Sequence, residues 1–299
     1  MNLLITGTSG FVGSALYKYA SNMSDINCIG VSRSGVNSDI SFDELFESDT
    51  LSRVDVIIHT IGRAHGSNVT SLSEFTSTDV DVLKRLLDKS INTSVRRVVL
   101  LSSINVYSSN SKAISFTTEP KATSINGMSK LAAESLLIEM SNKNNFEFCI
   151  LRSCLIYGKD APGNFGALTE LVKRLPVLPF GLANNRRDFI AVQNLSDLLV
   201  TCAIHPAAAG HIFLASDGET VSLKEFTNAM AKGLGKKVFQ LPVPVGLMRL
   251  VGKVAGKSAT MEQLFGNLEV DSSNTREILG WTPPFTMEQS MALLKHTDK

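Results

Sequence analysis

The sequence predicts an α/β fold in which a doubly wound parallel sheet carries a smaller C-terminal α/β lobe. In the first half, near-continuous apolar segments alternate with helical patterns, and a glycine-rich turn joins the first apolar segment to the first helix. Apolar runs of this kind are typical of parallel strands that helices cover on both faces. Right-handed crossovers between such strands produce a doubly wound sheet.

The individual elements follow from these patterns in chain order. Strands are expected at residues 2–6, 26–32, 54–60, 95–102 and 146–151. Apolar positions at helical spacing indicate helices at 11–21, at 72–91, from Lys130 to about 142, and at 194–205, 222–234, 244–255 and 286–296. Because the pattern loosens in the second half, we expect a main domain over residues 1–160 and a smaller lobe, interleaved with it, over 161–299.

The composition excludes several classes of protein. Of the 299 residues, 43% are hydrophobic and 19% are charged, as in globular proteins. A net charge of +1 gives no long-range field to attract nucleic acid or an anionic membrane, so we expect neither as a partner. No apolar stretch approaches the ~18 residues that span a bilayer, and no secretory leader is recognisable. Scattered cysteines, without metal-ligand spacing, indicate a reducing cytoplasm and no metal.

The first turn has the spacing of a dinucleotide-binding loop. In "ITGTSGFVGSAL" the three glycines are Gly7, Gly10 and Gly13. They allow a tight turn, a close approach of the backbone to a pyrophosphate, and close packing of the helix on the sheet. The helix N-terminus supplies free N–H groups for the phosphates. We therefore expect a Rossmann-type cofactor site that includes Gly7, Ser9, Gly10, Phe11, Val12 and Gly13; the alternative is a glycine-rich turn in an unrelated α/β protein.

The end of the second strand bears on the choice between NAD and NADP. A carboxylate there holds the ribose 2′-OH of NAD, whereas an arginine accommodates the 2′-phosphate of NADP. The sequence "GVSRSG" offers Ser32 and Arg33 and no acid. NADP(H) is therefore favoured, with NAD(H) as the alternative if Arg33 is only a solvated surface residue.

Three further motifs carry a family resemblance: "VVLLSSINVY" at 98–107, "NGMSKLAAE" at 126–134 and "LRSCLIYG" at 151–158. Together with the glycine turn, they make the chain similar to the extended short-chain dehydrogenase/reductases. It resembles most their nucleotide-sugar epimerase/dehydratase branch, which includes UDP-glucose 4-epimerases and 4-keto-sugar reductases. The resemblance extends over nearly the whole chain and implies hydride transfer at C4 of a UDP-hexose or UDP-4-keto-6-deoxyhexose.

The resemblance also implies a catalytic set of serine, tyrosine and lysine. Ser103 matches the serine, with Ser102 as a rival, and Lys130 matches the lysine. The tyrosine belongs four residues before the lysine, where this chain has Asn126. In the family the lysine lowers the pKa of the phenol, which exchanges a proton with the sugar. An amide cannot exchange a proton at useful pH.

Three explanations for Asn126 remain open at this stage. It is an engineered substitution that blocks turnover, or a natural feature of a divergent or impaired member. Otherwise another group supplies the proton, such as Ser103, Tyr107 or a water relayed through Lys130. A non-catalytic NAD(P)-binding sensor of the same fold is the alternative function.

Further residues are assigned by resemblance only. Ser102, Lys130 and the loop of Thr60, Ile61, Gly62 and Arg63 are expected at the cofactor. Asn164 and Arg187 are expected at the sugar diphosphate, with Asp188 orienting the arginine, although the segment "NNRRDF" could be a solvated turn. Helices at 72–91 and 127–142 would form a homodimer.

Overall fold

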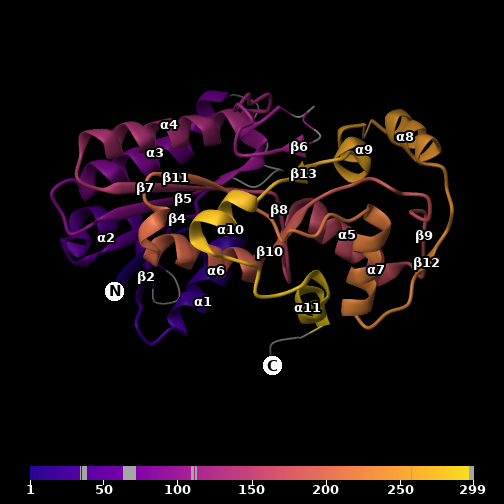
Figure 1. The fold of residues 1–299 in the computed structure, drawn as a ribbon, viewed down its shortest axis with the longest axis horizontal. Helices are drawn as coiled ribbons and strands as arrows, with labels where there is room; N and C mark the ends of the chain where they lie inside the picture. Colours follow the sequence, from indigo (N-terminus) through magenta and orange to yellow (C-terminus); the bar gives the residue numbers. More distant parts are fainter. Residues whose placement is uncertain are drawn as a thin grey trace.

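The core of the molecule is a seven-stranded parallel sheet in the order β11-β7-β5-β4-β1-β2-β3 (Figure 1). The computed structural model describes residues 1–33, 35, 39–62, 72–108, 111, 113–256 and 258–295, with the backbone alone for 72–79 and 259. The strands are β1 (Asn2–Thr6), β2 (Asn27–Ser32), β3 (Ile40–Ser41), β4 (Val56–His59), β5 (Arg97–Ser103), β7 (Glu147–Ser153) and β11 (His211–Ala215). This finding confirms the predicted fold class.

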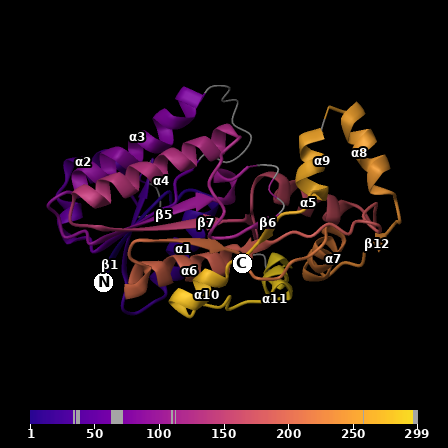
Figure 2. The same ribbon diagram turned by 45° about the horizontal axis from the view of Figure 1, so that its top comes forward.

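Helices cover both faces of the sheet, as Figures 1 and 2 show from two directions. One face carries α1 (Phe11–Ser21), α6 (Val192–Ile204) and α10 (Ser273–Leu279), and the other carries α2 (Phe42–Glu47), α3 (Leu72–Ser90) and α4 (Ile125–Lys143). The central strands are buried throughout, and each face has its own apolar cluster. Buried strands of this kind explain the near-continuous apolar runs in the sequence.

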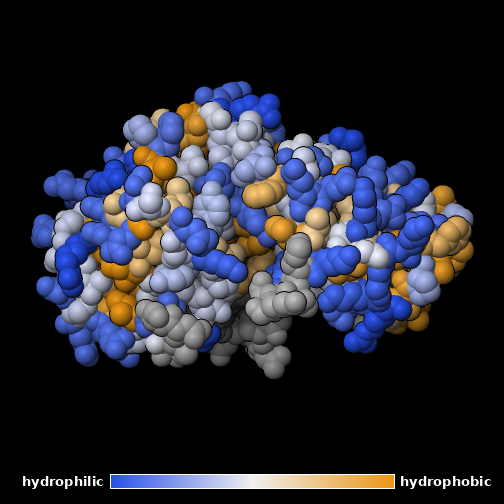
Figure 3. Space-filling model, turned by 90° about the horizontal axis from the view of Figure 1, so that it is seen from below, coloured by the Kyte–Doolittle hydropathy of each residue, from blue (hydrophilic) through white to orange (hydrophobic). Residues whose placement is uncertain are grey.

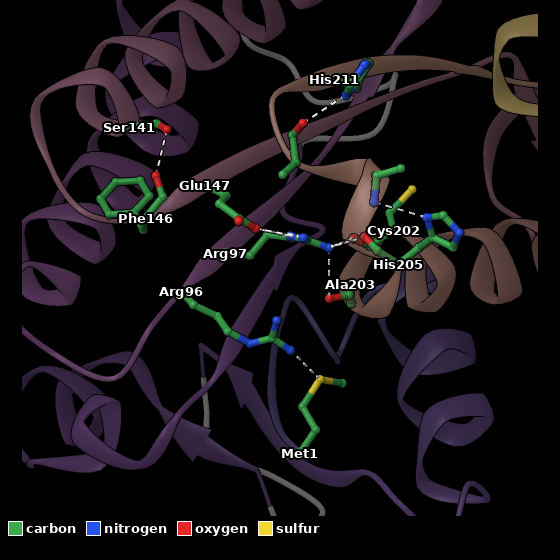
Figure 4. Close-up of polar contacts among 12 residues, drawn as sticks. Met1, Arg96, Arg97, Ser141, Phe146, Glu147, Cys202, Ala203, His205 and His211 are labelled. Carbon is green, nitrogen blue, oxygen red and sulfur yellow. Dashed lines mark hydrogen bonds and ion pairs between the residues drawn. The ribbon is translucent and has the colours of Figure 1, made fainter. Parts of the chain in front are cut away.

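The second half of the chain contributes α6 and β11 to the main layers. Arg97 of β5 links α6 to the sheet. Its buried guanidinium donates hydrogen bonds to the carbonyl oxygens of Cys202, Ala203 and His205 at the end of α6, at 2.7–3.3 Å (Figure 4). The same guanidinium pairs with Glu147 of β7 at 2.7 Å. A cation at a helix C-terminus satisfies carbonyls that lack partners within the helix.

A smaller lobe lies at the carboxyl edge of the sheet. Its elements are β8 (Leu155–Tyr157), α5 (Gly163–Arg174), β9 (Val177–Leu178), β10 (Phe189–Ala191), α7 (Leu223–Gly233), β12 (Phe239–Gln240), α8 (Val245–Val254), α9 (Ser258–Phe265) and α11 (Met287–Ala292). An aromatic cluster forms its core, in which Phe226 stacks on Phe189 and meets Tyr157 and Phe165 edge-on. The remaining short pieces are β6 (Ala113–Ile114), which pairs with β13 (Glu269–Val270), and the 3₁₀ turns η1 (Thr50–Arg53), η2 (Ile104–Val106), η3 (Pro206–Ala208) and η4 (Leu293–Lys295).

The expected elements and the observed ones differ in one place that matters for the site. The helix expected from Lys130 begins five residues earlier, at Ile125, because Ser124 caps it by accepting a hydrogen bond from the Gly127 amide at 3.1 Å. The division of the chain at residue 160 stays a prediction. Within the described ranges, no helix is both long and apolar enough to cross a membrane.

Candidate active site

A cavity of about 520 Å³ lies at the carboxyl edge of the sheet, between the glycine turn and the smaller lobe. Ligands of doubly wound folds bind at this edge. The cavity brings together most of the residues predicted for the site: Gly7, Gly10, Phe11, Val12, Gly13, Thr60, Gly62, Ser102, Ser103, Asn126, Lys130, Asn164 and Arg187. One site therefore joins the glycine turn to the serine–lysine pair.

The glycine turn fits a dinucleotide. Gly7 has φ +85°, a left-handed conformation that favours glycine, and its carbonyl oxygen accepts the Gly10 amide at 2.9 Å. A Cβ on Gly13 would collide with that carbonyl group. Helix α1 starts next to the cavity without a side-chain cap, which leaves its first N–H groups for a pyrophosphate.

Four predicted cofactor residues do not line the cavity. Ser9 and Arg33 are exposed, and the buried hydroxyl of Ser32 has no hydrogen-bond partner among the described residues. Ile61 contributes its backbone, since its carbonyl oxygen accepts a hydrogen bond from Lys130 Nζ at 2.9 Å. Arg63 lies outside the described residues.

Asp39 places an acid beside the glycine turn that the sequence pattern did not predict. Its carboxylate accepts a hydrogen bond from the hydroxyl of Thr8, in the glycine turn, and packs against Gly30 of β2. Asp39 reaches this place from the start of β3, which pairs with the end of β2. A search for an acid at the end of β2 alone could not find it. The cofactor region therefore contains a negative charge as well as Arg33.

The start of α4 places Asn126 and Lys130 in the cavity, one helical turn apart. A Cβ on Gly127 would collide with the carbonyl oxygen of Asn105 in η2, so glycine permits the close contact between this helix end and the end of β5. Asn126 Oδ1 is buried and has no hydrogen-bond partner among the described residues. The amide therefore offers a buried acceptor to a ligand at the position where the family has a phenol.

His59 lies behind Lys130 and is structural. Its Nδ1 is 2.9 Å from the hydroxyl of Thr6, and the ring is fully buried at the end of β4. Burial, followed by the positive charge of Lys130, lowers the pKa of His59 to about 3. The imidazole is consequently neutral near pH 7 and carries no proton for exchange in this range.

The structure distinguishes the two candidate serines. Ser102 is buried and donates its proton to Glu134 Oε1 at 2.5 Å, whereas Ser103 is half-buried and its Oγ accepts the Asn105 amide at 3.2 Å. The hydroxyl proton of Ser103 therefore stays available to a ligand. Glu134 also pairs with Arg152 at 2.6 Å, and both side chains are buried.

Neither nearby tyrosine replaces the missing phenol in the cavity. Tyr107 accepts a hydrogen bond from Arg152 at 2.7 Å, and burial raises the pKa of its phenol. Tyr157 donates to Asp217 at 2.9 Å, and burial, followed by that carboxylate, raises its pKa further. Both hydroxyl groups are held in buried hydrogen bonds, and neither tyrosine is among the residues that line the cavity.

On the substrate side, Asn164 and Arg187 reach the cavity from the smaller lobe. Burial lowers the pKa of the Arg187 guanidinium, which forms no ion pair with the residues that the structure describes. A half-buried cation of this kind suits a diphosphate. The expectation that Asp188 orients Arg187 is wrong, because Asp188 accepts hydrogen bonds from Thr220 at 2.6 Å and from the backbone of β13. Gln263 of α9, which no sequence motif indicates, also lines the cavity.

The fold and this cavity have the architecture of a Rossmann-type dinucleotide site. Residues 3–215 match the NAD dependent epimerase/dehydratase family. A UDP-glucose 4-epimerase from Vibrio cholerae is 34% identical over 304 residues, which cover 96% of this chain and 92% of that protein.

Solved structures show the same fold at lower identity. A UDP-glucose 4-epimerase from Thermotoga maritima, with UDP-glucose, has a TM-score of 0.77 and 19% identity and covers 98% of this chain and 97% of its own. A human epimerase family protein with NADPH has a TM-score of 0.76 and 17% identity, with 99% of both chains covered. The chain belongs to the NAD-dependent epimerase/dehydratase family, which confirms the resemblance drawn from the sequence.

The buried pair of Glu134 and Arg152 generates a test of stability. Glu134→Gln leaves Arg152 without its counter-ion, and we expect the free energy of unfolding in urea to fall by about 3–5 kcal/mol. Glu139→Gln is the matched control on the same helix, because Glu139 is exposed and water screens its pairing with Lys143, so that we expect little change in stability. Similar losses in the two variants would contradict a buried, structural role for Glu134.

Proposed function

We propose that this chain has the site of an enzyme that transfers a hydride at C4 of a UDP-hexose or UDP-4-keto-6-deoxyhexose. Proton transfer in this site is impaired, because Asn126 stands where the family has a tyrosine. The observation that carries the proposal is the placement of Asn126, Lys130 and Ser103 on one cavity with the glycine turn. When bound there, a nicotinamide dinucleotide would supply the hydride carrier. The names of the relatives, which are UDP-glucose 4-epimerases, support the substrate class.

The side chains have separate roles in this proposal. Ser103 donates a hydrogen bond to the reacting sugar oxygen, since its proton is not committed elsewhere among the described residues. Lys130 holds the nicotinamide ribose and stabilises negative charge at the reacting oxygen. Arg187 neutralises the sugar diphosphate. Asn126 occupies the position of the acid–base group and can only donate or accept a hydrogen bond.

A second candidate is a non-catalytic protein that senses NAD(P) and UDP-sugars. The amide at position 126 and the commitment of Tyr107 and Tyr157 to buried networks favour this alternative. Both candidates predict that a dinucleotide binds. They differ in whether restoring the phenol restores chemistry.

Asn126→Tyr separates the two candidates. A phenol one turn before Lys130 would have its pKa lowered by the ammonium group, so we expect turnover of UDP-glucose or UDP-galactose to rise by about 10²–10⁴-fold. Coupled spectrophotometric assays of both directions measure this change.

Asn126→Phe is the matched control, because it adds the ring without the hydroxyl and should leave turnover at the starting level. If the tyrosine and phenylalanine variants are equally inactive with UDP-sugars while both still bind cofactor, the chain is a sensor. If neither variant binds cofactor, the fold of the site was disturbed, and Asn126→Gln then tests binding alone.

We propose NADP(H) as the preferred cofactor, with NAD(H) as the alternative. Arg33 is exposed directly after β2, where an arginine can accommodate a 2′-phosphate, and one related fold carries NADPH. Asp39 acts in the opposite sense, because its carboxylate near Thr8 would repel that phosphate and accept the ribose hydroxyl of NAD. The balance between the two charges sets the selectivity.

Two variants measure that balance. Arg33→Ala should lower the ratio of NADPH to NADH affinity, and Asp39→Asn should raise it, each on the order of tenfold, as expected for one unit charge near a solvated phosphate. Fluorescence titration with both nucleotides gives the ratios. An unchanged ratio in both variants would show that neither residue contacts the adenosine ribose.

A further inference from the structure

The end of the smaller lobe exposes apolar side chains on one helix. In α8 the exposed fractions are 52% for Leu247, 58% for Leu250, 61% for Val251 and 85% for Val254. These positions follow the spacing i, i+3, i+4 and i+7, which places them on one helical face. Figure 3, which views the molecule from below, shows further apolar surface at the same end, where β9 and β12 lie in Figure 1. We call these four side chains the α8 stripe.

The stripe is not explained by the packing of α8 within the lobe. The opposite side of the helix packs inward through Val245, Met248 and Gly252, and a Cβ on Gly252 would collide with Met261 of α9. The helix is therefore apolar on two faces, of which only one is covered by the chain. A contiguous exposed apolar face is typical of a docking surface.

The segment of sequence that contains the stripe is basic. Between Phe226 and Met261 the sequence has six basic residues and no acidic one, so the rest of the chain has a net charge of −5. Lys232 is paired with Glu288 of α11 and Arg249 with Glu262 of α9. Lys253 is exposed on α8 and forms no ion pair with the described residues.

We propose that α8 docks this protein on an anionic lipid bilayer, with the α8 stripe entering the interface and the neighbouring basic side chains contacting lipid headgroups. A helix with exposed apolar residues flanked by lysine and arginine binds in the plane of a membrane surface. The near-zero net charge of the whole chain does not oppose this, because headgroup attraction acts only within about a Debye length. The proposal is independent of the proposed reaction.

The position of α8 is consistent with docking of the folded protein. α8 lies at the end of the molecule opposite α3 and α4 in both ribbon views (Figures 1 and 2). It packs on α9, whose Gln263 lines the cavity. A bilayer at α8 would therefore leave the main sheet in water and place the smaller lobe next to the lipid.

Sedimentation of the full-length protein with vesicles tests the proposal. We expect binding to vesicles of phosphatidylglycerol and phosphatidylcholine, weaker binding as salt rises, and little binding to pure phosphatidylcholine. Leu250→Gln combined with Val254→Gln should reduce the partition coefficient at least tenfold by removing apolar burial. Lys253→Gln should reduce it by roughly fivefold.

The controls lie elsewhere on the surface. Ile204→Gln changes an exposed apolar residue of the main domain, and Lys121→Gln changes an exposed lysine, so neither should alter binding. Unchanged thermal unfolding would show that the α8 variants remain folded, because the replaced side chains are exposed. Absence of binding to anionic vesicles, or equal binding by all variants, overturns the proposal. It is also overturned if the stripe variants abolish self-association of the protein in the absence of lipid while vesicles bind nothing.

Discussion

The position of helix α4 against the sheet is the constraint on which the site depends. Glu134 ties the helix to β5 through Ser102 and to β7 through Arg152, and Gly127 allows its first turn to contact η2. A buried charge pair of this type tolerates little displacement, because either partner alone would be an uncompensated charge in the interior. Asn126 and Lys130 are therefore held at one edge of the cavity, opposite the glycine turn.

The fold around position 126 does not depend on the side chain there. The amide side chain sits at the helix end without a structural hydrogen bond among the described residues, and the surrounding network does not involve it. In the proposed site Lys130, on the same helix, binds the ribose, whereas the groups proposed for the pyrophosphate and the sugar diphosphate lie on α1 and on the smaller lobe. We therefore expect affinity for nucleotides to be kept under either of the two proposed functions.

Much of the fold was predictable because buried parallel strands consist of near-continuous runs of apolar residues, which can be recognised in the sequence. β1, β2, β4, β5 and β7 were expected close to their observed bounds. β11 was missed, because its five residues are short and follow a helix of the second half. The start of α4 was missed because Gly127 has the sequence signature of a loop, although its lack of a Cβ is what allows the helix to pack on Asn105.

The site was predictable where a residue acts within a local motif, as with Gly7, Ser103 and Lys130. It was not predictable where tertiary contacts decide the role. Asp39 arrives from a neighbouring strand, and Gln263 from α9, so no spacing along the chain relates them to the glycine turn. For Asp188 the expectation itself was wrong. Asp188 follows Arg187 in the sequence, but its carboxylate binds Thr220 instead of the arginine.

The geometry of the cavity predicts that the glycine turn and Lys130 bind one dinucleotide between them. A crystal structure of the protein with NADP⁺ tests this most directly. We expect the pyrophosphate at the start of α1 and Lys130 Nζ within about 3 Å of a nicotinamide ribose hydroxyl. A dinucleotide bound outside this cavity, or bound with the ammonium group turned away to solvent, would contradict the account.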